Sequence, residues 1–323
     1  MTLTLHSDHP VALADLGGTN CRFALWQPGT PPRDVTTVTR FRNDDFDSLA
    51  SMVQAYLRRV PGERPREAVI AIAAPITGDV IDMPNRDWRF SRTEIAKLAD
   101  LNRLDFINDF EAQALAIASL KSTERRTLGP ERSPSGRTAA VLGPGTGLGV
   151  AGLIETHEPP ISITGEGGHM SLAPNNALEE RLIGEVRDRF GHCSGERLIS
   201  GAGLELLHEL LHDEHDTPAE AISAAALAGE SRARATFNQF FAFLGSIAGD
   251  VALVLGATRG VYIGGGVAFE NALLLGQSPF RERFTAKGRY ESYLDRIPTY
   301  LITAETPALF GLAQYAASRE DQQ

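Results

Sequence analysis

The sequence has few of the residues that would place it in a disulfide-bonded, secreted or membrane-spanning class. Its only two cysteines, Cys21 and Cys193, are far apart and form no C-x-x-C pair. A disulfide framework is therefore excluded and a cysteine-bound zinc cluster is disfavoured. The first ten residues contain no basic segment followed by an apolar one, so no secretory signal is expected. No run of about eighteen apolar residues is recognised, so we expect no membrane span and a reducing, cytoplasmic environment.

Positive charge is also scarce. The chain has 31 Lys and Arg residues against 41 Asp and Glu residues, which gives a formal net charge of −10. This balance argues against a general nucleic-acid binder and against a basic membrane-surface protein. It does not exclude a phosphorylated ligand, because local backbone N–H groups and a metal ion can neutralise one. The 323 residues, 42% hydrophobic and 22% charged, are typical of a globular protein with two ordinary domains.

Apolar runs alternate with stretches of helical periodicity in the first part of the chain. Val11–Asp15 and Cys21–Trp26 are expected to form the two strands of a hairpin. The continuous apolar run Glu67–Ile76 predicts a buried strand, and the spacing of apolar residues predicts a helix over Asp47–Arg59. A further strand and the helix that follows it are expected over Arg103–Leu120. This alternation favours an α/β domain.

The second part of the chain repeats the opening pattern once. Lys121–Thr138 is polar and is interpreted as a linker or exposed loop, and Thr138–Glu155 then contains an apolar strand, a glycine-rich turn and another strand. The likeness to the first hairpin indicates an internal duplication. Ala177–Leu255 is expected to be mostly helical. Gly260–Phe269 predicts a buried strand that ends in three glycines, and Pro307 is expected to begin a terminal helix.

The two glycine-rich turns, "DLGGTN" and "GPGTG", can be interpreted in two ways. Glycine, Asp and Asn tolerate the positive φ angles of tight turns, so each can be a simple hairpin turn. Alternatively, their bare N–H groups can hold the phosphates of a nucleotide between them. Asp15 and Thr19 would then contribute on one side, and Gly145 and Thr146 on the other. The P-loop pattern G-x-x-x-x-G-K-[ST] is absent from the sequence, so a different nucleotide fold is needed.

Asn108 and Asp109 lie at a predicted strand-to-helix junction. With Glu111 three residues on, Asn108 resembles a capping box, and acidic residues suit a helix N-terminus. Asp109 can also act as a general base that accepts a proton from a substrate hydroxyl as that oxygen attacks phosphorus. The two roles are compatible.

Three further segments combine glycines with polar groups. Glu166 and His169 bracket two glycines in "GEGGH", a pattern suited to a polyhydroxylated ligand, and Glu196 precedes another glycine-rich turn. A lone His and Glu at this spacing are a weak metal signal. The glycines from Gly264 to Gly266 end an apolar strand, where they allow a base or ribose to approach the backbone or a helix to pack closely.

Six segments occur in the order found in bacterial glucokinases, and the chain resembles that family: "LADLGGTN", "FINDFEAQALA", "LGPGTGLGVAGL", "GEGGHMSLAP", "SGERLISGAGL" and "VYIGGGV". The wider superfamily also contains heat-shock chaperone ATPases and actin. The resemblance implies an α/β, two-domain, actin-like (ribonuclease H-like) ATPase fold with an interdomain cleft and hinge. The smaller domain would comprise residues 1–118 and 308–323, and the larger one residues 119–307. Two distant cysteines cannot supply the clustered cysteine motif of the zinc-containing branch, so the resemblance is to the zinc-free branch.

The resemblance implies ATP-dependent phosphorylation of D-glucose to glucose 6-phosphate, with Asp109 as the base on the 6-hydroxyl. Residues matching those that hold glucose are Asn85, Asn108, Asp109, Glu166, His169 and Glu196. Residues matching the ATP site are Asp15, Gly17, Gly18, Thr19, Asn20, Gly145, Thr146, Gly264 and Gly265. Asp15 matches the carboxylate that organises Mg²⁺ through water. The family commonly forms homodimers. A kinase of the same fold for another hexose, or a non-catalytic sugar sensor, remains an alternative.

Overall fold

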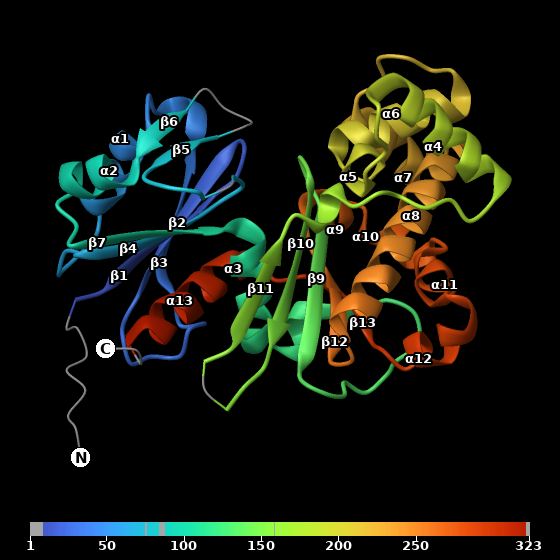
Figure 1. Cartoon of the computed structure of the whole chain (residues 1–323). Helices are drawn as coiled ribbons and strands as arrows, with labels where there is room; N and C mark the ends of the chain where they lie inside the picture. Colours follow the sequence, from blue (N-terminus) through green and yellow to red (C-terminus); the bar gives the residue numbers. More distant parts are fainter. Residues whose placement is uncertain (1–8, 75, 84–87, 158, 321–323) are drawn as a thin grey trace. The chain divides into compact units, whose positions relative to one another are not determined.

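The computed structural model describes residues 9–74, 76–83, 88–157 and 159–320, and the chain divides into two compact units (Figure 1). Unit 1 consists of Met1–Leu120, Glu155–Ser162 and Ala304–Gln323. Unit 2 consists of Lys121–Ile154 and Ile163–Thr303. Neither unit is a continuous stretch of sequence, because the chain returns to unit 1 twice, at Glu155–Ser162 and at Ala304–Gln323.

Unit 1 is built on a five-stranded sheet with the order β3-β2-β1-β4-β7. The first two strands form the antiparallel hairpin predicted from the sequence, and β1, β4 and β7 run parallel, as strands joined by crossover connections do. The strands are β1 Val11–Leu16, β2 Asn20–Trp26, β3 Thr36–Arg42, β4 Glu67–Ile72 and β7 Arg103–Asn108. A separate two-stranded ribbon consists of β5 Val80–Asp82 and β6 Arg89–Ser91.

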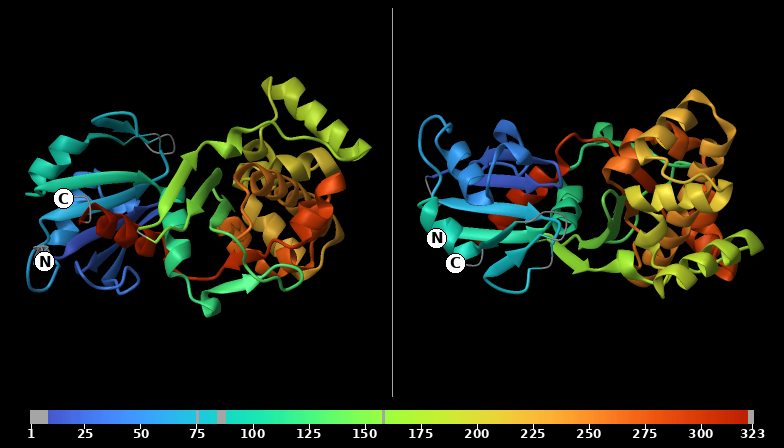
Figure 2. Two further views of the ribbon diagram at one scale, coloured as in Figure 1. Left: turned by 60° about the horizontal axis from the view of Figure 1, so that its bottom comes forward. Right: turned by 90° about the horizontal axis from the view of Figure 1, so that it is seen from above.

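Helices cover both faces of this sheet. One face packs against α1 and α2 in a core that includes Leu16, Phe23 and Tyr56. On the other face, α13 packs against β1 and β4, and α3 packs against β4. Figure 2 shows the red C-terminal helix against the blue strands. The elements are α1 Leu49–Leu57, α2 Arg92–Leu98, α3 Asp109–Ala116, α13 Pro307–Glu320 and the 3-10 turns η1 Asn43–Asp45 and η2 Ile117–Ser119. α3 and α13 approach closely at Gly311, where a Cβ atom would lie 1.7 Å from the carbonyl oxygen of Ala112.

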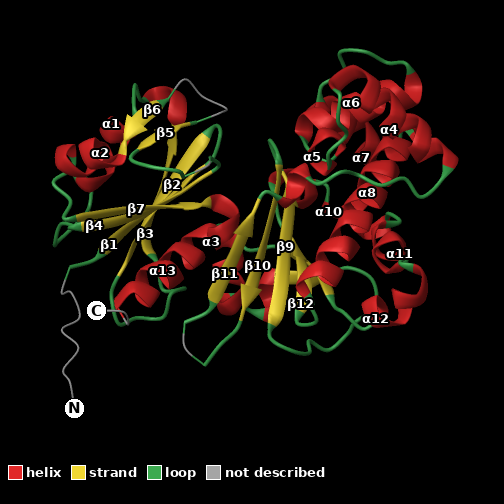
Figure 3. Ribbon diagram, in the orientation of Figure 1, coloured by secondary structure: helices red, strands yellow, loops and turns green. Residues whose placement is uncertain are grey.

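Unit 2 contains a six-stranded sheet with the order β11-β10-β9-β12-β13-β8. The strands are β8 Arg125–Thr127, β9 Thr138–Pro144, β10 Leu148–Ile154, β11 Ile161–Gly165, β12 Gly260–Ile263 and β13 Thr299–Ile302. β9 and β10 form the second predicted hairpin. The inward side chains of β9, including Ala140 and Leu142, pack into one large core with the helices that lie beside the sheet (Figure 3).

The helices of unit 2 surround one long central helix, α8. They are α4 Ala177–Phe190, α5 Gly195–Leu198, α6 Gly201–His212, α7 Ala219–Ala228, α8 Ser231–Leu255, α9 Gly266–Glu270, α10 Ala272–Gln277, α11 Phe280–Thr285 and α12 Glu291–Asp295, with η3 Ser122–Glu124, η4 Gly167–His169 and η5 Gly288–Tyr290. Among the described residues, α8 is the one helix long and apolar enough to cross a membrane by length and composition alone. Polar residues such as Asn238, Gln239 and Asp250 interrupt this helix, so it is not the continuous apolar run that the sequence was expected to lack. In its most apolar window 67% of the helix is buried inside the protein, as in the core helix of a globular domain.

Part of the segment Lys121–Thr138, expected to be a linker or exposed loop, belongs to the sheet of unit 2, whereas residues 129–137 form a mostly exposed loop as expected. Its strand β8 pairs antiparallel with β13, and Leu128 beside it is buried. The Thr299 hydroxyl donates to the carbonyl of Leu128. The loop interpretation was wrong for β8 alone, because this short edge strand is rich in polar residues and its partner lies more than 170 residues further along the chain.

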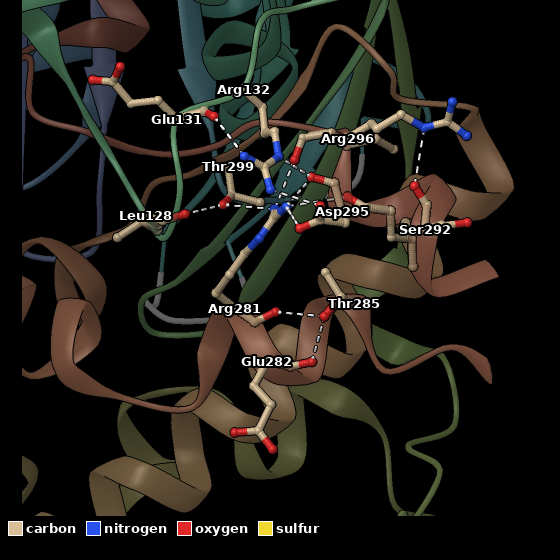
Figure 4. Close-up of polar contacts among 12 residues, drawn as sticks. Leu128, Glu131, Arg132, Arg281, Glu282, Thr285, Ser292, Asp295, Arg296 and Thr299 are labelled. Atoms are coloured by element: carbon tan, nitrogen blue, oxygen red, sulfur yellow. Dashed lines mark hydrogen bonds and ion pairs between the residues drawn. The ribbon is translucent and has the colours of Figure 1, made fainter. Parts of the chain in front are cut away.

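Two arginines form hydrogen bonds at this same edge of unit 2. Figure 4 shows Arg132 and Arg281 converging on Asp295, whose carbonyl accepts hydrogen bonds of 2.8 Å from each of them. Arg132 also donates to the Asp295 carboxylate at 2.8 Å, and Arg281 donates to the carbonyl of Ile297. The polar segment is thereby held at a defined position next to α12.

Two strand predictions require correction at their ends. The run Glu67–Ile76 was expected to be one strand, but β4 ends at Ile72. The strand in Gly260–Phe269 ends at Ile263, and Gly266 already begins α9. Apolar residues continue past both ends because they pack in the core without being hydrogen-bonded as strand.

Candidate active site

The first glycine turn of unit 1 is fixed by Asn43, a buried residue of η1. Its side-chain amide donates to the carbonyl oxygens of Gly17 at 2.8 Å and Gly18 at 3.0 Å. Its backbone N–H donates to the carbonyl of Thr19 at 2.9 Å, and the turn closes with a 3.0 Å bond from the N–H of Gly17 to the carbonyl of Asn20. Asn43 donates to three successive carbonyl groups of the turn. A ligand bound there would therefore meet hydrogen-bond donors rather than acceptors.

Asp15 lies on β1 just before this turn. Its carboxylate is 3.5 Å from the guanidinium of Arg22, which is its partner across the hairpin. Burial raises the pKa of Asp15 above its usual range, and Arg22 opposes that shift. A partly buried carboxylate whose charge is incompletely compensated has a residual preference for a cation, which suits it to an ion organised through water.

Asn108 and Asp109 lie at the same edge of the sheet as the first turn. Leu16 at the end of β1 pairs with Ile72 of β4, and Ile72 pairs with Asn108 at the end of β7. With two strand spacings between them, the ends of β1 and β7 are separated by roughly 10 Å. The structure therefore brings the predicted base and the predicted phosphate turn of unit 1 to one sheet edge.

The expected cap on α3 is present, but the capping box is only half formed. The side-chain oxygen of Asn108 accepts from the N–H groups of Phe110 at 2.8 Å and Glu111 at 3.3 Å. The Glu111 carboxylate does not reciprocate as expected; it accepts from the Ser162 hydroxyl at 2.9 Å. The side-chain oxygen of Asn108 thus caps the helix, and its NH₂ group is the part suited to donate to a substrate oxygen.

Asp109 is the first residue of α3 and is half-buried. One of its carboxylate oxygens accepts from the N–H of Phe110 at 3.0 Å. Its position at the N-terminus of α3 places the carboxylate near the partial positive charge of the helix dipole. The side chain is therefore oriented by the backbone of its own helix, at the end of a parallel strand where ligands commonly bind in α/β sheets.

In unit 2 the structure joins two of the predicted sugar residues to the second glycine turn. Glu196 lies at the start of α5 and accepts from the N–H of Leu148 at 2.9 Å. Its other oxygen is 3.9 Å from Nε2 of the exposed His169. A Cβ atom at Gly147 would lie 2.4 Å from the Glu196 carboxylate, so a side chain at that turn position would displace it.

Glu166 precedes η4 and His169 is its last residue, and η4 packs against β10. The N–H of His169 donates to the carbonyl of Glu166 at 3.0 Å, so both residues belong to one tight turn. A Cβ atom at Gly168 would lie 2.0 Å from the carbonyl oxygen of Leu148, which explains the glycine there. The turn leaves both polar side chains exposed.

The glycines after β12 lie against the end of β9. Gly265 has φ +81°, and a Cβ atom there would lie 2.3 Å from the carbonyl of Pro144. The N–H of Gly264 donates to Leu142, and the N–H of Gly145 closes its own turn on Gly147 at 2.8 Å. The predicted adenosine glycines and the second phosphate turn, which includes the exposed Thr146, therefore share one corner of unit 2.

The predicted residues thus form one group within each unit. Unit 1 holds Asp15, Gly17, Gly18, Thr19, Asn20, Asn108 and Asp109, and unit 2 holds Gly145, Thr146, Glu166, His169, Glu196, Gly264 and Gly265. Asn85 lies outside the described residues. Reasoning from the sequence missed Asn43 and Arg22, since neither has a local signal: each acts through a partner that the fold brings close.

Comparison with known proteins identifies the class and then the family. A glucokinase from an Antarctic psychrotroph superimposes with a TM-score of 0.83 at 35% identity, covering 96% of this chain and 99% of that one. A ROK family glucokinase from Streptomyces griseus, crystallised with glucose and AMPPNP, shares the fold at 19% identity, with a TM-score of 0.64 over 95% of this chain and 98% of its own. The class is therefore that of sugar kinases with the two-domain, actin-like ATPase fold.

The family follows from closer relatives. The family model for Glucokinase matches residues 12–319. A glucokinase from Aromatoleum aromaticum is 44% identical over 94% of both chains. A "Bifunctional protein glk" from Burkholderia lata is 41% identical over 97% of this chain, which spans about half (49%) of that relative's length. The chain belongs to the glucokinase family, so the family and the fold class expected from the sequence are confirmed.

Proposed function

We propose that this chain transfers the terminal phosphoryl group of ATP to the 6-hydroxyl of D-glucose. The supporting observation is the placement of Asp109 at the same sheet edge as the turn Gly17–Thr19. A base and a phosphate cradle on one rigid sheet can align an acceptor hydroxyl with a phosphoryl group, and alignment supplies much of the catalysis in this reaction.

Asp109 holds the 6-hydroxyl and accepts its proton as the oxygen bonds to phosphorus, and ADP leaves with the electrons of the broken phosphoanhydride bond. The Asn108 NH₂ group orients the same sugar. Glu166, His169 and Glu196 accept from or donate to its other hydroxyls, and Asn85 joins them. Hydroxyls matched one by one to fixed polar groups give strong discrimination among sugars.

The adenine nucleotide lies with its phosphates between the two glycine turns and its adenosine on the Gly264–Gly265 side. The same fold accommodates AMPPNP and glucose together in the Streptomyces griseus protein. Mg²⁺ fits the residues present, because it binds through one or two carboxylates, water and substrate phosphates rather than through a protein cage. Asp15 would hold it through water, and the ion neutralises charge on the phosphates when bound. In the described residues no group of three or more His, Cys, Asp or Glu side chains is placed to hold a metal alone.

The proposal includes movement and assembly. Two domains, residues 1–118 with 308–323 and residues 119–307, close on the sugar through a hinge and exclude water from the phosphoryl group. The enzyme acts in the cytoplasm as a homodimer.

Sugar-dependent formation of ADP by the purified chain tests the function. The assay compares glucose with mannose, glucosamine and fructose, each with ATP and Mg²⁺. We expect turnover with the highest kcat/KM for glucose. A higher kcat/KM for another hexose would redirect the proposal to that acceptor, and sugar binding without ADP formation would identify a sensor instead.

A further inference from the structure

A pocket of 460 Å³ lies directly beside the first glycine turn and is lined by Thr19, Asn20, Arg40 and Arg42. All four residues belong to unit 1. Thr19 ends the turn and Asn20 begins β2, and the two arginines come from the neighbouring edge strand β3, where Arg42 pairs with Asn20. The arginines are two positions apart, so they lie on the same face of the sheet at a spacing of about 7 Å.

The two arginines of this pocket are not held in ion pairs within the described part of the chain, although the carboxylates Asp44 and Asp45 follow Arg42 in η1. Arg22, the next arginine on this face, pairs with Arg40 across the strands, but it has the Asp15 carboxylate at 3.5 Å. Within the described part of the chain, neither Arg40 nor Arg42 forms an ion pair with a carboxylate. Two such guanidinium groups side by side are notable in a chain whose net charge is −10.

The donors of the pocket are partly oriented already. Nε of Arg40 donates to the side-chain oxygen of Asn20 at 3.1 Å. That bond directs the remaining guanidinium N–H groups of Arg40 and leaves the Asn20 NH₂ group as a further donor. With the Thr19 hydroxyl, the pocket presents donors from guanidinium, amide and hydroxyl groups. Like the adjoining glycine turn, it therefore offers a ligand mainly hydrogen-bond donors. Such a set matches the oxygens of a phosphate, which arginine binds through two parallel hydrogen bonds.

We propose that Arg40 and Arg42 bind the phosphoanhydride chain of the phosphoryl donor, and so extend the phosphate turn into the neighbouring pocket. The inference rests on the proposed function for the identity of the donor. The rival explanation is that charged residues on β3 prevent unwanted pairing at the edge of the sheet. Edge protection requires charge but no contact with the nucleotide, so the two explanations differ in what the arginines do to donor binding.

The test replaces both arginines in the full chain (R40Q/R42Q) and uses Arg58→Gln as the matched control. Arg58 is an exposed arginine of unit 1 at the end of α1, outside the pocket. Titration calorimetry with tripolyphosphate, without sugar, measures binding apart from turnover. We expect the double variant to raise the Kd about tenfold and to lose much of its salt dependence. Inorganic orthophosphate, as a second ligand, should bind at least tenfold more weakly than tripolyphosphate to the unaltered chain.

Steady-state kinetics then connect the pocket with the donor. The double variant should raise the KM for ATP about tenfold and leave the KM for glucose within twofold, while Arg58→Gln changes neither. Unchanged tripolyphosphate affinity, or unchanged KM for ATP in a variant that no longer binds tripolyphosphate, would overturn the inference. If the unaltered chain forms no ADP with any hexose, the proposed function fails, and the calorimetry still decides whether the pocket binds a phosphate chain.

Discussion

At the scale of single residues, Asn108 and Asp109 of the candidate site are both oriented by backbone N–H groups at the start of α3. Asp109 accepts from the N–H of Phe110, and Asn108 accepts from the first turn of α3. Neither interaction is needed by a distant part of the fold. Changes at these residues should therefore separate catalysis from stability.

Replacing Asp109 by Asn should lower kcat by about 10²–10⁴-fold, the usual contribution of a general base. The amide keeps an oxygen for the Phe110 N–H, so the melting temperature should change little and the KM for glucose should remain within a few fold. Steady-state kinetics and calorimetry measure both. Glu94→Gln in the first turn of α2 is the matched control for a carboxylate at a helix N-terminus. A near-normal kcat in Asp109→Asn would remove this residue from the role of base.

Asp15→Asn should preserve or raise stability at neutral pH while lowering kcat at least tenfold. Burial raises the pKa of Asp15, so its ionised form opposes folding above that pKa. The pKa of Asp15 is higher in the folded protein than in the unfolded chain. The protonated carboxyl therefore favours folding at low pH, and this stabilisation is lost as the pH rises through the folded pKa. The gain in stability from Asp15→Asn should accordingly be present at pH 7 and become smaller as the pH falls toward about 4.

Calorimetry of Asp15→Asn at both pH values measures this difference. Asp82→Asn, which alters an exposed ion pair with Arg89, provides the control and should change stability by no more than about 0.5 kcal/mol. A lower melting temperature of Asp15→Asn at pH 7 would show that its pairing with Arg22 outweighs the cost of burial.

At the scale of elements, glycines set how closely two helices or a strand and a loop can approach. Gly311 allows α13 to contact Ala112 of α3, and Gly168 allows η4 to contact β10. These contacts position the helix that carries Asp109 and the turn that carries His169. The sequence shows the glycines but not the neighbours that make them necessary.

Gly311→Ala should destabilise the protein by about 1–3 kcal/mol, because the added methyl group would lie 1.7 Å from the Ala112 carbonyl and must push the helices apart. Gly184→Ala in α4 is the matched control, since nothing lies within 4 Å of its Cβ position. That substitution should stabilise by about 0.5–1 kcal/mol through helix propensity. Urea unfolding of both variants measures the contrast, and equal effects would contradict the assignment of this contact.

α4, α8 and α11 are tied together by one buried carboxylate. Glu179 is fully buried and accepts from both terminal guanidinium nitrogens of Arg283, from Gln239 and from the N–H of Asn175. Burial would raise the pKa of Glu179, but the hydrogen bonds from Arg283, Gln239 and Asn175 lower it below its usual range. The carboxylate therefore stabilises the fold above its unfolded pKa, and that contribution is lost as pH falls through the folded value.

Glu179→Gln should destabilise the chain by about 3 kcal/mol at pH 7, because it leaves the Arg283 charge buried without its partner. The difference from the unaltered chain should shrink below about pH 4, where the native carboxylate also becomes protonated. Urea unfolding at pH 7 and at about pH 3, below the usual carboxyl pKa, measures both values. A difference that stays constant over this range would show that Glu179 acts through packing rather than through its charge.

At the scale of the whole molecule, the sequence predicted most of the architecture. Apolar runs on either side of glycine turns predicted both hairpins, and family motifs predicted the class. Contacts that depend on tertiary packing were not visible. Asn43 fixes a turn 25 residues earlier, β8 pairs with a strand near the end of the chain, and Glu111 bonds Ser162 rather than its own cap. Sequence patterns report local periodicity, whereas these contacts depend on how the chain returns to itself.

That return has a consequence for synthesis. α13 buries Leu309 and Leu312 in unit 1, although most of unit 1 is made first and nearly all of unit 2 is made in between. While the ribosome is still translating, the early sheet has α1 and α2 on one face but lacks its last helix. Apolar β1 residues such as Leu13 then remain uncovered on that face, or are shielded by a chaperone, until α13 has been synthesised. Incomplete chains released before Pro307 should therefore aggregate through the sheet of unit 1, which is synthesised before unit 2, and not through unit 2.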